Sequence, residues 1–151
     1  MTMFRRIKVL LAYDRKTLLL FWEAFFFLGW ARIALFRPFV KVAPTLGVKS
    51  LETSFDSLNE HRTPIKHVAQ AVNVMSWYTP WESKCFVKAI AGMKMLERRK
   101  IESTLYLGTA KDENGHLIAH AWLRSGPLYV TGADVMKRYV VVEKFANFRR
   151  D

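Results

Sequence analysis

The apolar residues follow three different patterns along the chain, and each pattern predicts a different kind of element. Residues 17–36 are nearly all apolar. Between residues 63 and 98, apolar side chains recur every three or four residues, which is the period of an amphipathic helix. From residue 103 onward they alternate with polar ones, as in half-buried strands. Helices followed by strands predict an α+β domain in which helices cover an antiparallel sheet.

The N-terminal stretch combines a basic amphipathic segment, residues 4–16, with the apolar segment 17–36. The apolar segment is long enough to span a bilayer, but Glu23 and Arg32 would each cost about 2.5 to 3.5 kcal/mol near its centre. We therefore interpret it as a long core helix. A membrane span, or a helix that lies on a membrane or against a partner protein, stays open. The residues assigned to the buried side are Leu18, Phe21, Trp22, Phe25 and Leu28.

Two further helices are predicted before the strands. Pro38 and residues 43–47 end the first helical region, and residues 48–62 are expected to form a loop or a short helix. A new helix is expected at Thr63, with Thr63 as N-cap and Pro64 in the first helical position. His67 falls off the apolar face of this helix and is expected to be solvated.

The next helix carries the only cysteine of the chain, Cys85. Thr79 with Glu82 would form a capping box that puts Cys85 in the second turn, whereas Ser83 as cap would put it in the first. The second register matters for chemistry, because unpaired N–H groups and the helix dipole act mainly within the first turn. There they favour a thiolate and offer donors to an oxyanion.

Four strands are expected over residues 103–110, 116–124, 128–131 and 139–145. Asn114-Gly115 is a strong hairpin signal between the first two, and residues 125–127 make the second turn. We expect a single domain over residues 1–151, with a basic, apolar helical region at 1–62 and the helix-and-sheet core at 63–151.

His120 lies in the second of these strands, on the face shared by residues 116, 118 and 122. We expect that face to be covered by the helix that carries Cys85. A cysteine at a helix start facing a strand histidine is the arrangement of thiol proteases. Zinc is the competing chemistry, but His116 and His120 are about 13 Å apart along an extended strand, too far for one ion. We therefore expect no metal and no cofactor.

Amino-acid composition limits the locations and partners that this protein can have. A single cysteine excludes an internal disulfide and favours a reducing, cytoplasmic location. The chain has a net charge of +11, and residues 1–49 hold nine cations against two acids. This excess favours an anionic partner, and peripheral contact with the inner membrane face is one form of it. The chain has no glycine-rich phosphate loop and no internal repeat.

Three segments carry a resemblance to a known family: SKCFVKAIAGMKMLERRKIESTLYLGTA, GHLIAHAWLRSG and LYVTGADV. With the basic, apolar N-terminal region, they resemble the transglutaminase-like cysteine peptidases of lasso-peptide biosynthesis, in the split form of their B protein. The resemblance covers most of the chain. It implies a transglutaminase-like or papain-like peptidase core and hydrolysis of the leader from a ribosomally made precursor peptide.

The resemblance also implies roles and partners. Cys85 matches the nucleophile and His120 the general base, while Asp134 matches the acid, with Glu143 as the alternative. The Cys85 N–H would be one oxyanion donor, and a group near Trp81 the second. A small leader-binding protein would deliver the precursor, an ATP-dependent macrolactam cyclase would act on the product, and nucleic acid is not an expected partner. A transglutaminase-type acyl transferase and a non-catalytic basic adaptor are the alternative functions.

Overall fold

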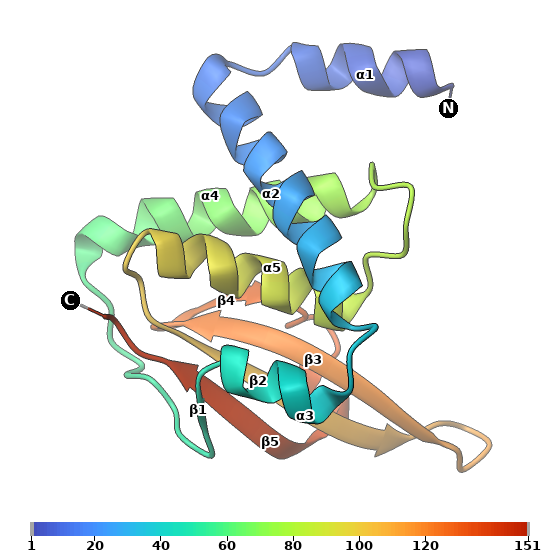
Figure 1. Ribbon diagram of the computed structural model, residues 1–151, viewed down its shortest axis with the longest axis vertical. Helices are drawn as coiled ribbons and strands as arrows, with labels where there is room; N and C mark the ends of the chain where they lie inside the picture. The colour runs from blue at the N-terminus through green and yellow to red at the C-terminus, as the bar shows by residue number, and fades with distance from the viewer. Residues whose placement is uncertain (1, 151) are drawn as a thin grey trace.

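The computed structural model describes residues 2–150, and it places helices on one face of a five-stranded antiparallel sheet (Figure 1). The predicted α+β architecture is confirmed. The sheet order is β1-β5-β2-β3-β4. The helical elements are α1 (Met3–Leu11), α2 (Arg15–Ala34), α3 (Phe39–Val42), η1 (Ala43–Thr45), α4 (Asn59–Ser76), α5 (Cys85–Arg98) and η2 (Met136–Arg138). The strands are β1 (Val48–Lys49), β2 (Ser103–Lys111), β3 (Leu117–Ser125), β4 (Leu128–Thr131) and β5 (Val140–Asn147).

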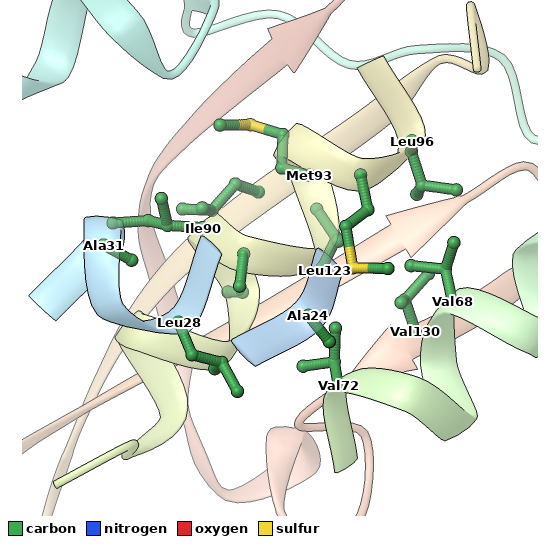
Figure 2. Packing of buried hydrophobic residues seen from close by; sticks show 14 of the residues in the cluster. Ala24, Leu28, Ala31, Val68, Val72, Ile90, Met93, Leu96, Leu123 and Val130 are labelled. Carbon is green, nitrogen blue, oxygen red and sulfur yellow. The ribbon is translucent and has the colours of Figure 1, made fainter. Parts of the chain in front are cut away.

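Helix α5 lies at the centre of the core. Its apolar side chains pack between α2 and α4 on one side and the sheet on the other, as Figure 2 shows. Gly92 of α5 lies so close to the sheet that a Cβ there would be 3.0 Å from Leu123 Cδ2 and 3.4 Å from Val130 Cγ1. Such close packing fixes α5, and with it the start of the helix, relative to β3.

The four predicted strands are present, as is the hairpin at Asn114-Gly115. The prediction for residues 48–62 is corrected in two places. Val48–Lys49 is a strand that pairs with β5, and α4 begins at Asn59 rather than at Thr63. The N-cap is Leu58, and Pro64 lies inside the helix. Glu60 in the first turn complements the helix dipole, so the helix can start before the proline although Pro64 forfeits one backbone hydrogen bond.

An extended segment, residues 50–57, covers the part of the other sheet face around Arg124. Arg124 of β3 is 1% exposed and holds this segment by donating to the carbonyls of Thr53 and Ser54 at 2.9 and 3.0 Å. It also donates to Tyr106 Oη at 2.9 Å, and the Phe55 ring lies 3.7 Å from its guanidinium. Since the hydrogen-bond acceptors of this buried cation within residues 2–150 are neutral oxygens, we assign Arg124 a structural role.

Helix α2 has two apolar faces. Phe21, Ala24, Leu28 and Ala31 are buried against the core, in agreement with the core-helix interpretation. Trp22 is 69% exposed, so its assignment to the buried side was wrong. A helix that is apolar all round gives no periodicity from which the buried face can be read, which is the physical reason for the error.

Candidate active site

Cys85 is the first residue of α5 and is half-buried. The sequence left two registers open, and the structure has Cys85 in the first turn, although the N-cap is Lys84 rather than Ser83. The Ser83 and Thr79 hydroxyls instead bond to each other at 2.8 Å, so neither of them caps α5. The first N–H groups of a helix have no partner inside it, and at this terminus no side chain caps them. The thiol therefore lies beside backbone donors and the positive end of a helix dipole.

His120 lies on β3, where its ring is held between two aromatic rings and a backbone carbonyl. The rings of Trp122 and Tyr139 have centroids 5.8 and 5.0 Å from that of His120. His120 Nε2 is 2.9 Å from the Gly132 carbonyl oxygen. Because a carbonyl can only accept, this hydrogen bond puts the proton on Nε2 and leaves the lone pair on Nδ1. Nδ1 is thus the nitrogen available to accept a proton.

Cys85 and His120 approach β3 from opposite faces, which corrects the prediction that α5 covers the His120 face. Ala121 and Leu123 belong to the core shared with the helices, whereas His120 and Trp122 alternate with them on the other face. The alternation was read correctly, but the smaller apolar side chains, not the histidine and tryptophan, fill the space under the helices. Within residues 2–150, no hydrogen bond joins Cys85 to His120.

The two residues nevertheless lie at a similar level along the strand. Helix α5 and β3 run in the same general direction (Figure 1), and Gly92 lies against Leu123. Cys85 lies about 10.5 Å back along the helix from Gly92, and His120 about 10 Å back along the strand from Leu123. The register pairs β4 only with Leu123–Ser125, so the neighbouring edge of β3 at His120 is left open by that strand. Gly132, which follows β4, lies along this edge instead, 2.9 Å from His120 Nε2, and a Cβ on it would be 2.7 Å from the Ala121 carbonyl oxygen. Cys85 and His120 therefore lie at the same end of the α5–β3 pair, but on opposite faces of the strand.

The two candidate acids lie in different surroundings. Asp134 is exposed in the connection from β4 to β5, two residues after the Gly132 carbonyl that holds His120, and it makes none of the hydrogen bonds in the described part of the chain. Glu143 lies on β5 and is occupied elsewhere. A hydrogen bond from the Lys144 backbone N–H, together with the Ser50 hydroxyl and Lys49, holds the pKa of Glu143 below its usual range. The structure brings neither carboxylate to the His120 ring.

Trp81, which precedes the cysteine by four residues in the sequence, carries an unpartnered donor. Its Nε1 is buried and has no hydrogen-bond partner among the described residues. The ring packs against Phe25 with centroids 5.0 Å apart, and against Gly29, where a Cβ would be 3.2 Å from the indole. A buried N–H without an acceptor is unfavourable unless a ligand supplies one. Proximity in sequence to Cys85 was the only signal of this group, and the sequence pointed only to some backbone or side-chain group near Trp81.

His116 does not join a metal site with His120. It lies exposed at the hairpin, 3.6 Å from Asp112, and β3 starts only after it. Among residues 2–150, no group of three or more His, Cys, Asp or Glu side chains is arranged to hold a metal ion.

An apolar groove of about 750 Å³, which sequence reasoning missed, lies between α1, α2 and residues 75–80. Its lining includes Leu10, Phe21, Phe25, Tyr78 and Pro80. It thus reaches the loop that leads into α5.

The sequence was compared with models of known protein families. The model of the transglutaminase-like superfamily matches residues 32–144, which include Cys85, His120, Asp134 and Glu143. No curated protein and no solved structure gives a significant match.

Proposed function

Because the chain belongs to the transglutaminase-like superfamily, which covers cysteine peptidases and transferases, we propose that it is a cysteine peptidase with Cys85 as nucleophile and His120 as general base. The observation that carries the proposal is the position of the only cysteine as the first residue of α5. To become a nucleophile, the Cys85 thiol needs a base with a free lone pair. The hydrogen bond from His120 Nε2 to the Gly132 carbonyl leaves such a lone pair on His120 Nδ1.

The reaction proceeds through two acyl transfers. His120 Nδ1 takes the proton of the Cys85 thiol, and the sulfur attacks the carbonyl carbon of the scissile peptide. The tetrahedral intermediate collapses when the C–N bond breaks and the imidazolium gives its proton to the leaving amine. Water, deprotonated by the same imidazole, then attacks the thioester. This step releases the carboxylate and restores the thiol.

The oxyanion of each intermediate needs donors that are already in place. The Cys85 backbone N–H is the first, because it lies at the unpaired end of α5. Trp81 Nε1 is the second candidate, since it is buried without an acceptor. A preorganised donor of this kind is worth about 10² to 10³ in rate.

Closure of the Cys85–His120 pair requires movement at the edge of β3 beside His120, where Gly132 lies. The residues that hold the His120 ring, Gly132 and Tyr139, belong to the connection from β4 to β5, which has no strand partner over residues 132–138. Catalytic hydrogen bonds are often long before substrate binds and tighten in the complex. We assign Asp134, on the same connection, to stabilise the imidazolium once the pair has closed, with Glu143 as the alternative.

The substrate we propose is a ribosomally made lasso-peptide precursor, from which the enzyme removes the leader. The resemblance of the segments around Cys85, His120 and Asp134 supports this choice. A separate leader-binding protein would raise the rate by tethering the precursor at an effective concentration on the order of millimolar. The product would pass to an ATP-dependent macrolactam cyclase in the cytoplasm.

Cleavage of the precursor, followed by mass spectrometry with and without the leader-binding protein, tests this function. Cys85→Ala and His120→Ala should each abolish cleavage, because triad members act as a unit. Leu117→Ala is a matched control, since Leu117 is exposed on the same strand as His120. Cleavage by Cys85→Ala at the wild-type rate would refute the assignment. Full activity that the partner does not change would refute tethering.

The family match also covers acyl transferases, which differ only in the acceptor of the thioester. Adding a primary amine to the same reaction separates the two functions. A peptidase yields the free carboxylate as main product, whereas a transferase yields the amide.

A further inference from the structure

Helix α2 exposes a line of large apolar side chains along its whole length. Trp22, Phe26 and Ile33 are 69%, 65% and 66% exposed, and Leu19 and Trp30 fall in the same line. At 100° per residue these positions lie within an arc of about 80°, roughly opposite the buried face of the helix. We call these five residues the α2 stripe. At the rise of an α-helix the stripe is about 20 Å long. It is therefore a continuous apolar surface, unlike the single exposed apolar residues that are normal on a protein surface.

Helix α1 extends this apolar surface. None of its residues is buried, and Phe4, Ile7 and Leu11 are exposed. In Figure 1, α1 projects beyond the end of α2 away from the sheet. Its inner side lines the groove shared with α2, to which Ile7 and Leu10 contribute. Of the residues of α1, only Leu10 packs against the core cluster, and it is only partly buried. The core therefore does little to fix the orientation of this short helix, and another surface is needed to fix it.

The charges around the stripe are almost all positive. Helix α1 contains Arg5, Arg6 and Lys8 and no acid, and Arg15 with Lys16 begin α2. The only carboxylate within α2, that of Glu23, is neutralised on the side of α5. It accepts hydrogen bonds from Arg99 at 2.8 and 2.7 Å and lies 3.0 Å from Arg98.

We propose that α1 and the α2 stripe dock the protein on an anionic lipid surface. A helix with Trp, Phe and Leu on one side and cations at its end binds at the headgroup boundary through apolar burial and attraction to acidic lipids. The basic flank gives the surface its lipid specificity. The stripe itself presents no acid to repel such a surface.

The helix lies on the membrane and does not cross it. By length and composition alone, α2 could span a bilayer. Its other face, however, forms part of the core through Phe21, Ala24, Leu28 and Ala31. If α2 crossed the membrane, these side chains would leave the core and open a cavity in it. If α2 lies flat on the membrane, the stripe is buried and the core stays intact.

Vesicle flotation of the full chain tests the proposal, with phosphatidylcholine vesicles that contain or lack phosphatidylglycerol. We expect binding to the anionic vesicles that weakens as salt is raised. Phe26→Ser combined with Leu19→Ser should weaken binding at least about tenfold, because each side chain loses its apolar burial. Replacing Arg5, Arg6 and Lys8 by Gln should abolish the preference for anionic vesicles. Leu117→Ser, an equally exposed position on β3, should bind as the wild type does.

Three results would overturn the proposal. Failure to bind either vesicle, equal binding to both, or binding that the stripe variants do not change would each contradict it. If the wild type does not bind vesicles but sediments as an oligomer that Phe26→Ser dissociates, the stripe joins copies of this chain instead. Circular dichroism of each variant confirms that loss of binding does not reflect unfolding.

Discussion

Replacement of Gly132 by alanine should damage both stability and activity, because this glycine is both left-handed and closely packed. Its φ is +75°, and a Cβ there would lie 2.7 Å from the Ala121 carbonyl oxygen, 2.8 Å from Trp122 Cβ and 3.0 Å from His120 Nε2. The left-handed conformation costs an L-residue about 1 to 2 kcal/mol. Overpacking adds about 1 to 3 kcal/mol, since two of the three contacts are to atoms that cannot rotate away. The sum is about 2 to 5 kcal/mol.

Gly115→Ala separates these two effects. Gly115 has a similar φ of +78°, but nothing lies within 4 Å of a Cβ placed there. Urea unfolding of this variant should show only the conformational loss of about 1 to 2 kcal/mol. The difference between the free energies of unfolding of Gly132→Ala and Gly115→Ala measures the cost of overpacking beside His120.

Precursor cleavage by the same two variants tests whether that contact matters for the chemistry. The Gly132→Ala methyl group must displace the carbonyl that holds His120, and a displacement of about 1 Å can reduce the rate about 10²-fold. Gly115→Ala lies at the hairpin and should cleave as the wild type does. Equal cleavage rates for the two variants, measured where both are folded, would refute the role given to the Gly132 hydrogen bond.

Three further variants test other parts of the account. Trp81→Phe keeps the ring but removes the unpartnered Nε1–H, so kcat should fall about 10² to 10³-fold with little loss of stability by thermal unfolding. Asp134→Ala should reduce cleavage less than His120→Ala does; an unchanged rate would direct attention to Glu143. Burial alone would raise the pKa of Glu23, but the hydrogen bonds and charge of Arg99 outweigh it and hold that pKa below 4.5. The ion pair therefore stabilises the fold above about pH 4.5, and this contribution is lost as the pH falls through the lowered pKa. Glu23→Gln should lower stability at pH 7 by about 1 kcal/mol and flatten the acid side of the profile.

The elements with a clear hydrophobic period were predictable from the sequence. Alternation identified β2, β3, β4 and β5, and the Asn-Gly signal identified the hairpin. β1 was missed because its two residues are both exposed and carry no alternation. The start of α4 was missed because capping residues and prolines only favour a helix start at a given position. Favourable residues that precede them, such as Glu60, can move the start of the helix towards the N-terminus.

The elements that carry Cys85 and His120 could be predicted from the sequence, but the contacts of these two residues could not. The capping residues allowed Cys85 in the first or the second turn of the helix, and in the structure it lies in the first. It could not say which face of β3 the helices cover, because both faces carry large side chains. The Gly132 carbonyl as partner of His120 was invisible, since a backbone acceptor has no signature in the sequence.

The central claim is that Cys85 is a nucleophile activated by His120, and the rate of its alkylation tests this claim without knowledge of the substrate. Folded protein is treated with iodoacetamide at neutral pH, and the adduct is followed by intact-protein mass spectrometry. A single cysteine makes the site of the adduct unambiguous. We predict rapid labelling of the wild type, labelling at least about tenfold slower in His120→Ala, and wild-type labelling in Leu117→Ala. A wild-type thiol that stays unlabelled while the protein is folded, or that reacts equally fast without His120, would contradict the account.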